Sequence, residues 1–141
     1  MTEKDIVKTY LAAFYREHKE LDVIEGLLAE DFVFVGPMAT FHGREPFMKF
    51  IREIGPQKNQ IEIHKIVADA GEVAVFHDFR SETPVIGPLP FAEWYSLQGG
   101  KITSLRLYFD AREFAPLLQD QMPGEKGATE KEGQSKPEKT D

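Results

Sequence analysis

The chain has 141 residues, a formal net charge of −7 and no cysteine. The acidic balance argues against a nucleic-acid surface, which needs a basic stripe to neutralise phosphates. The absence of cysteine excludes a disulfide framework, a thiolate zinc site and a cysteine nucleophile. Residues 1–30 carry charges throughout, and no apolar run reaches the ~20 residues of a membrane helix, so we expect no signal peptide, no membrane span and a cytoplasmic location.

Helical patterns dominate the first part of the chain. Thr2 followed by Asp5 predicts a capped helix start, and apolar residues continue at three- and four-residue spacing to Phe14. The next predicted elements are a helix over 20–29, a short strand over 32–36 and a turn over 41–43. A third helix is predicted over 44–55, because Pro46 suits a first helical turn and a Gly-Pro pair follows.

The rest of the predicted domain is rich in strand patterns. Strands are predicted over 61–70, 72–82, 90–97 and 101–110, as consecutive hairpins of one antiparallel sheet. A short helical segment over 112–121 closes the predicted domain. The order ααβαββββ predicts an α+β fold, a cone-shaped barrel in which a curved antiparallel sheet wraps around the N-terminal helices.

A polar and charged segment ends the chain. Residues 122–141 mix Lys, Glu, Gly, Pro, Ser and Thr with almost no apolar side chain. Such a segment buries too little apolar area to offset the entropy of ordering. We therefore expect a folded domain over 1–121 and a disordered tail over 122–141, which is either a solubilising extension or a partner-binding tail.

The stretch FAEWY, residues 91–95, places a carboxyl group in a predicted core strand. Alternation puts Phe91, Glu93 and Tyr95 on one face and Trp94 on the other. A carboxylate on the apolar face is costly unless it is paired, and it tends to become protonated there. Glu93 is therefore expected to be a hydrogen-bond donor in an apolar pocket. The alternative is a structural ion pair with one of the arginines Arg44, Arg80 and Arg106.

Three segments carry a family pattern: IVKTYLAAFYREHKELDVIEGLLAEDFVFVGP, FHGREPFMKFI and GKITSLRLYFD. Together they resemble the nuclear transport factor 2-like superfamily, in its SnoaL-like and ketosteroid-isomerase-like branch, and the resemblance covers about 1–116. The fold hosts isomerases, cyclases, dehydratases, epoxide hydrolases and binding modules, so it does not by itself define a function.

The resemblance implies roles for a few residues. Tyr10 and Glu93 align with the oxyanion-hole tyrosine and protonated aspartic acid of ketosteroid isomerase, which is itself the established example of a neutral carboxylic acid donating to an oxyanion. The general base of that family aligns with Gly36, which cannot accept a proton. Two residues are candidates to replace this general base. Asp110 lies in a region where SnoaL-like cyclases resemble this chain in having an acid, and His42 lies in a predicted turn. Asp31 is more typical of an acid in a turn.

Other side chains are candidates for binding. Phe14, Phe34, His42, Tyr95 and Phe109 are expected to line a pocket for a hydrophobic small molecule, or else to fill the core. Trp94 is expected to contact a second subunit in a homodimer. No cofactor is expected. His64, His77 and Asp78 lack a recognised ligand spacing, so no metal site is predicted.

Three functions remain open on the sequence. The first is a SnoaL-like protein with a hydrophobic pocket, acting as a cofactor-independent isomerase or cyclase with Tyr10 and Glu93 as donors to the oxyanion. The second is a non-catalytic dimeric ligand-binding module, suggested by Gly36. The third is an epoxide hydrolase of the limonene type, which needs an Asp-Arg-Asp arrangement that the sequence does not place.

Overall fold

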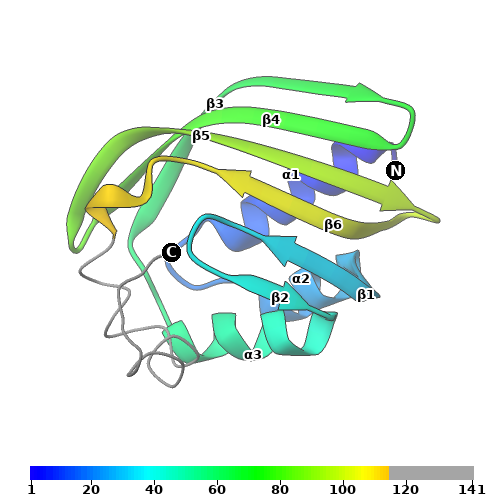
Figure 1. The fold of residues 1–141 in the computed structure, drawn as a ribbon, viewed down its shortest axis with the longest axis horizontal. Coiled ribbons are helices and arrows are strands. Elements are labelled where there is room, and N and C mark those ends of the chain that lie inside the picture. Colours follow the sequence, from blue (N-terminus) through cyan, green and yellow to red (C-terminus); the bar gives the residue numbers. More distant parts are fainter. Residues whose placement is uncertain (115–141) are drawn as a thin grey trace. The chain divides into compact units, whose positions relative to one another are not determined.

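The computed structural model describes residues 1–114 and divides the chain into two compact units, Met1–Phe109 and Asp110–Asp141. The first unit contains helices α1 (Glu3–Phe14), α2 (Leu21–Leu27) and α3 (Arg44–Ile54), together with six strands. Figure 1 shows α1 lying across one side of a curved sheet and α3 running below strands β1 and β2.

The six strands form one sheet in the order β2-β1-β6-β5-β4-β3. Their bounds are Leu28–Val35 (β1), Thr40–His42 (β2), Asn59–Asp69 (β3), Glu72–Glu82 (β4), Val85–Gln98 (β5) and Lys101–Tyr108 (β6). Strands β3 to β6 are joined as consecutive antiparallel hairpins, as predicted. The pair β1–β6 is parallel, so the sheet is mixed rather than wholly antiparallel. The α+β fold with a curved sheet is confirmed, and the sheet is open.

The turn predicted over 41–43 is wrong in part. Phe41 and His42 belong to β2, which pairs with β1 so that Phe41 lies opposite Phe34. The ring centres of Phe34 and Phe41 are 6.1 Å apart, and the packing of these rings favours a strand over a turn at Phe41 and His42. The chain turns one residue later, at Gly43, where φ is 105°. The element order is therefore ααββαββββ rather than ααβαββββ.

Helix α1 begins as predicted. Asp5 N donates to Thr2 Oγ1 and Thr2 N donates to Asp5 Oδ2, both at 3.1 Å, which forms a capping box. One face of the helix is buried among residues of the sheet. The largest fully buried side chains in the core belong to Tyr10, Phe32, Phe47, Tyr95, Ile24, Leu28, Met48, Ile51 and Ile102. The core therefore lies between the helices and the concave side of the sheet.

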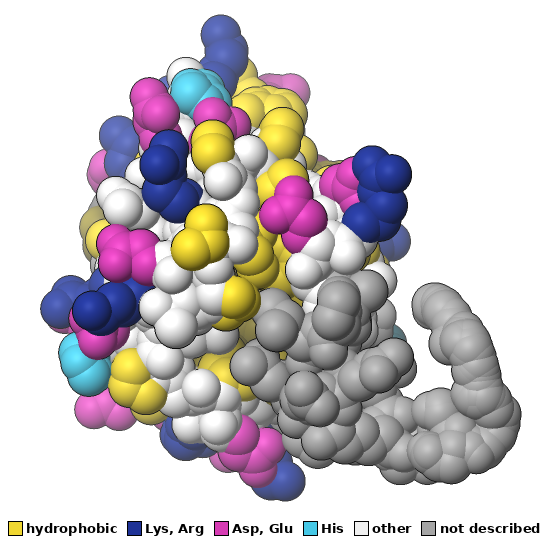
Figure 2. Space-filling view, turned by 90° about the vertical axis from the view of Figure 1, so that its left-hand side faces the viewer, with side chains coloured by type: hydrophobic (Ala, Val, Ile, Leu, Met, Phe, Trp, Pro, Cys, Tyr) yellow, Lys and Arg dark blue, Asp and Glu magenta, His cyan; other side chains and the backbone are white. Residues whose placement is uncertain are grey.

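The end of the predicted domain differs from the prediction. Strand β6 stops at Tyr108, and Asp110 caps a short 3₁₀ helix, Ala111–Glu113. The helix predicted over 112–121 lies mostly outside the described residues, and the predicted tail over 122–141 lies wholly outside them. Within residues 1–114, no helix is long and apolar enough to cross a membrane. Figure 2 shows acidic and basic side chains interspersed over the face that it draws.

Candidate functional site

Glu93 is buried at the centre of the sheet's concave side. Its side chain is 1% exposed, and it lies on β5 between Phe91 and Tyr95, which point to the same side. The neighbouring Trp94 is 42% exposed on the opposite side. The alternation predicted from FAEWY is therefore confirmed, and a carboxyl group is fixed inside an otherwise apolar core.

Three polar side chains converge on this carboxyl group. The Tyr15 hydroxyl donates to Glu93 Oε2 at 2.5 Å, and His77 Nε2 lies 2.8 Å from the same oxygen. The Tyr95 hydroxyl donates to Oε1. Within residues 1–114, the ion-pair partner of Glu93 is His77, rather than Arg44, Arg80 or Arg106. The two tyrosine hydroxyls are the donors in their bonds, whereas the direction of the His77–Glu93 bond depends on which ring nitrogen of His77 carries the proton.

Secondary structure explains why these groups meet. Tyr15 is the residue at which α1 ends, and its backbone N–H donates to Leu11 O at 2.9 Å. Tyr95 follows Glu93 by two residues on the same strand face. His77 lies on β4 opposite Phe91, which makes it a diagonal neighbour of Glu93 across the β4–β5 pair. One helix end and two adjacent strands therefore build the cluster of Tyr15, His77, Glu93 and Tyr95, which we name the Glu93 cluster.

The tyrosines of this region hold their protons strongly. Burial raises the pKa of Tyr10, Tyr15 and Tyr95 well above the ordinary value, and the nearby charge of Glu93 raises it further. The three hydroxyls therefore remain hydrogen-bond donors at neutral pH. Tyr10 is 1% exposed, and its ring packs edge-on against Tyr95 with centroids 5.7 Å apart.

His77 has a second nitrogen that the cluster does not use. With Nε2–H donating to Glu93, the neutral imidazole carries its lone pair on Nδ1. That atom is buried and has no hydrogen-bond partner in the described part of the chain. Such orphaned polar atoms are uncommon in protein interiors and call for an explanation. The ring lies between those of Tyr15 and Phe91, at centroid distances of 5.4 and 5.2 Å.

Aromatic residues surround the Glu93 cluster, and three predicted pocket residues are among them. Phe14 stacks on Tyr10 at 5.5 Å, and Phe109 stacks on Phe91 at 4.4 Å. Tyr95 belongs to the cluster itself. The predicted pocket residue Phe34 belongs instead to an adjoining group, where it stacks on Phe47 at 5.2 Å. The two groups are connected, since Phe14 also stacks on Phe47 at 6.5 Å.

The remaining predicted residues lie outside the cluster. His42 is exposed on β2, and Asp31 is exposed on β1 rather than in a turn. Asp110 lies in the second unit, is exposed and pairs with Arg112, which lowers its pKa to about 2. Among residues 1–114, Arg16, Arg52 and Arg112 each pair with one acid, and no arginine, Arg80 and Arg106 included, pairs with two. The Asp-Arg-Asp arrangement of an epoxide hydrolase is therefore not seen in this part of the chain.

Gly36, at the isomerase-base position, borders a hollow at the ends of β1 and β6. The hollow has a volume of 270 Å³ and is lined by Val35, Gly36, Pro37, Arg106, Leu107, Tyr108 and Phe109. A Cβ atom at Gly36 would lie 3.1 Å from the ring of Phe34. A larger side chain here would therefore require Phe34 to move.

Sequence reasoning missed Tyr15 and the role of His77. Tyr15 follows the last helical residue, where periodicity no longer says which way a side chain points. His77 was considered only as a metal ligand, although its alternation with Phe79 and Val75, both buried, already indicated an inward side chain. The sequence also did not predict the position of Lys19. Its Nζ lies 4.7 Å from the centre of the Phe14 ring, and burial lowers the pKa of its ammonium group.

Comparison with known proteins identifies the family of this chain. The SnoaL-like domain family matches residues 7–105. This chain belongs to the SnoaL-like domain family. A search of the curated proteins finds no match.

Solved structures of several kinds share the SnoaL-like fold of this chain. An NTF2-like protein of unknown function from Cytophaga hutchinsonii is 27% identical, with a TM-score of 0.68 over 82% of this chain and 96% of that one. A protein with a ketosteroid isomerase-like fold from Catenulispora acidiphila, in complex with trimethylamine, is 22% identical, with a TM-score of 0.64 over 77% and 88%. An LEH-like epoxide hydrolase from M. tuberculosis is 22% identical, with a TM-score of 0.64 over 89% and 95%. At these identities the last two establish the fold alone.

Proposed function

We propose that this SnoaL-like protein binds a hydrophobic small molecule with a carbonyl group and shifts a proton on it without a cofactor. The observation that carries the proposal is the Glu93 cluster, in which a buried carboxyl group receives three hydrogen bonds inside an aromatic core. Titratable groups held in an apolar interior are typical of acid–base sites, although structural networks have them too. The likeness to ketosteroid-isomerase-like folds agrees with proton transfer.

His77 is the proposed base, in place of the residue missing at Gly36. Glu93 accepts the Nε2–H of His77 and so orients the ring and stabilises the imidazolium when it forms. Nδ1 is left as the proton acceptor. This assigns Glu93 an accepting and orienting role. The predicted donor role of Glu93 toward an oxyanion requires a proton on the carboxyl group and remains a separate prediction.

The proposed reaction is an allylic shift of a double bond in a β,γ-unsaturated ketone. His77 Nδ1 takes a proton from the carbon beside the ligand carbonyl, the C–H electron pair forms the enolate C=C bond, and the carbonyl π pair moves to oxygen. Tyr10 donates a hydrogen bond to that oxygen, because its raised pKa keeps the hydroxyl protonated. In a β,γ-unsaturated ketone this enolate is a dienolate, so the proton returns from Nδ1 to the γ-carbon. The β,γ double bond moves to the α,β position, and the electron pair on oxygen restores the carbonyl. Atoms and charge balance without a cofactor.

Naphthol binding tests whether the aromatic core around the Glu93 cluster admits a ligand, because a naphtholate resembles an enolate. The full chain is titrated with fluorescent naphthols of rising acidity, together with the variants Tyr10→Phe and His77→Gln. We expect saturable binding that strengthens with acidity and that weakens about tenfold in Tyr10→Phe, the effect of losing one hydrogen bond to a charged oxygen of ~1.5 kcal/mol. Tyr108→Phe is the control, since Tyr108 is 51% exposed on the outer side of the sheet.

A second readout separates binding from proton transfer. Exchange of the α-protons of a cyclic enone in D₂O is followed by NMR. We expect His77→Gln to abolish exchange while retaining naphthol binding. Absence of naphthol binding by the wild-type chain would refute the pocket, and exchange that persists in His77→Gln would refute the base.

A non-catalytic dimeric binding module is the second candidate. It is supported by the outer side of the sheet, where Phe76, Trp94 and Tyr108 are 45%, 42% and 51% exposed. Large exposed aromatic groups on one face are typical of subunit contacts. In this case Glu93 would stabilise the interior, and a homodimer would form through the face that carries Trp94.

A further inference from the structure

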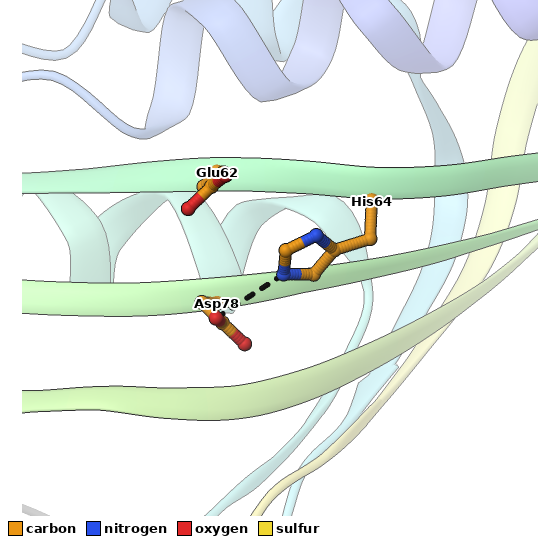
Figure 3. Close-up of side chains that lie close together, drawn as sticks. All are labelled: Glu62, His64 and Asp78. Atoms are coloured by element: carbon orange, nitrogen blue, oxygen red, sulfur yellow. Dashed lines mark ion pairs between the residues drawn. The ribbon is translucent and has the colours of Figure 1, made fainter.

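Outside the Glu93 cluster, three side chains with metal-binding atoms meet on the outer side of the sheet. They are Glu62 and His64 from β3 and Asp78 from β4, and one ligand atom from each lies within 4.8 Å of the others. Figure 3 shows the His64 ring directed toward Asp78 on the adjacent strand, with Glu62 nearby on the same strand as His64. His64 Nε2 is 3.1 Å from Asp78 Oδ2. His77, although next to Asp78 in sequence, points to the opposite side and belongs to the interior.

The backbone fixes this juxtaposition. Glu62 and Asp78 are directly opposite each other in the β3–β4 pair. His64 follows Glu62 by two residues and so shares its face, and the register then shifts between Ile63 and Lys65. The bulge makes His64 the extra residue on its strand. Ligands carried by two hydrogen-bonded strands are positioned more precisely than ligands carried by a loop.

Two further observations favour a cation at this place. Like charges directly opposite each other on neighbouring strands are destabilising, and Glu62 and Asp78 form such a pair. A hollow of 180 Å³ adjoins them, lined by Gln60, Ile61, Glu62, Asp78, Arg80 and Pro88. Arg80 and Lys65 are the basic side chains near the pair on the two strands. Arg80 lines the same hollow, so its positive charge opposes the binding of a cation there.

We propose that Glu62, His64 and Asp78 form a binding site for a divalent transition metal of the zinc type. Imidazole nitrogen and carboxylate oxygen are both zinc ligands, and an imidazole disfavours Mg²⁺ and Ca²⁺. With zinc bonds of about 2.0–2.1 Å, two tetrahedral ligands lie roughly 3.4 Å apart. The His64–Asp78 separation of 3.1 Å is close to that spacing. Glu62 is exposed and reaches the ion by changing its rotamer, and water or a ligand from another molecule takes the fourth position.

Metal titration of the full chain tests the site. Chelator-treated protein is titrated with ZnCl₂ by calorimetry, for the wild type and for His64→Gln, Asp78→Asn and Glu62→Gln. We expect one saturable site whose dissociation constant rises at least about tenfold in each variant, in line with the sensitivity of metal sites to their ligand shell. His18→Gln is the control, since His18 is an exposed histidine at the other end of α1 from the capping box. Arg80→Gln is expected to tighten binding by removing the competing charge.

Cobalt provides an independent readout that does not depend on variant stability. Co²⁺ added to wild-type protein is expected to broaden the amide NMR signals of residues 62–64 and 78 selectively. Absence of saturable Zn²⁺ binding, binding that is equal in His64→Gln and His18→Gln, or broadening centred on another part of the chain would overturn the proposal.

Discussion

At the scale of single residues, the decisive feature is the number of hydrogen bonds that the buried carboxyl group of Glu93 makes. A buried carboxylate without partners is very costly, whereas one that receives hydrogen bonds from Tyr15, His77 and Tyr95 is tolerated. Buried polar networks that are replaced by apolar residues often give proteins of equal or greater stability. The network therefore makes Glu93 compatible with the interior, and substitution of Glu93 measures how much the network contributes to stability.

The first prediction concerns the carboxyl group itself. Glu93→Ala leaves three buried donors without an acceptor, so we expect it to lower the free energy of unfolding by about 3–5 kcal/mol. Glu93→Gln keeps one acceptor oxygen and is expected to cost about 1–3 kcal/mol. Urea denaturation measures both changes. Exposed Glu82, on β4, supplies the control Glu82→Gln, expected within about 0.5 kcal/mol of wild type; a Glu93→Ala effect equally small would contradict the network.

The second prediction concerns alkaline pH. The pKa values of buried Tyr10, Tyr15 and Tyr95 are raised in the folded state. The unfolded chain therefore releases these protons first, so their contribution is fully present below pH ~10 and is lost as pH rises above it, by about 1.4 kcal/mol per pH unit for each tyrosine.

Denaturant unfolding between pH 8 and pH 11.5 measures this dependence. Above pH 10, we expect Tyr15→Phe to reduce the slope of the free energy of unfolding against pH by about 1.4 kcal/mol per pH unit, the contribution of one tyrosine, because phenylalanine has no proton to lose. Tyr108→Phe, which removes a hydroxyl group at an exposed position, is the matched control. Equal slopes for wild type and Tyr15→Phe would show that the Tyr15 hydroxyl is not held as the structure has it.

At the scale of elements, the long strand β5 does most to shape the concave side. It carries Glu93 and Tyr95 in its second half, while the register with β4 shifts between Phe79 and Ser81 near its beginning. Gly87 lies at this irregularity with φ of 87°, and a Cβ atom there would lie 2.3 Å from Phe79 O. The bend therefore depends on a residue without a side chain.

The third prediction follows from that contact. Gly87→Ala combines a left-handed backbone, costing about 1–2 kcal/mol, with a clash against a backbone atom that adds about 1–3 kcal/mol. Gly99→Ala isolates the first effect, because Gly99 has φ of 61° and nothing within 4 Å of its Cβ position. Thermal and urea unfolding of the two variants should differ by the steric cost. Equal destabilisation would show that β4 can move away.

How far the sequence predicts these elements depends on the kind of signal. Alternation in β4 to β6 and the Thr2 capping box have local causes, so the strands, their hairpins and the start of α1 were predictable. The short strand β2 depends on Phe41 packing against Phe34, a contact made only in the folded chain. The Glu93 cluster was half predictable: strand periodicity placed Glu93 and Tyr95, whereas Tyr15 enters from a helix end that periodicity does not orient.

At the scale of the whole molecule, the two sides of the sheet in the first unit differ in character. The concave side packs against the helices and carries the Glu93 cluster. The outer side exposes Phe76, Trp94 and Tyr108, and a hollow of 440 Å³ beside Trp94 is lined in part by Val67 and Ala74. Aromatic anchors next to a hollow are the features that dominate binding energy at protein interfaces. A second copy of the chain, presenting the same aromatic groups, is the occupant that we propose.

The last prediction tests this pairing. Trp94→Glu places a charge among the exposed aromatic groups and removes an anchor, so we expect the dimer dissociation constant to rise at least about 30-fold, the equivalent of a 2 kcal/mol hot spot. Sedimentation equilibrium at several protein concentrations measures it. Val85→Glu is the control, because Val85 is also an exposed apolar residue of β5, at 83%, but lies at the strand's beginning, nine residues before Trp94. A wild-type chain that is monomeric at every concentration would refute the dimer. A Trp94→Glu chain that still dimerises would show that the subunits meet through another face.

These outcomes do not bear on the proposed proton transfer, because naphthol titration measures ligand binding by the Glu93 cluster independently of the oligomeric state.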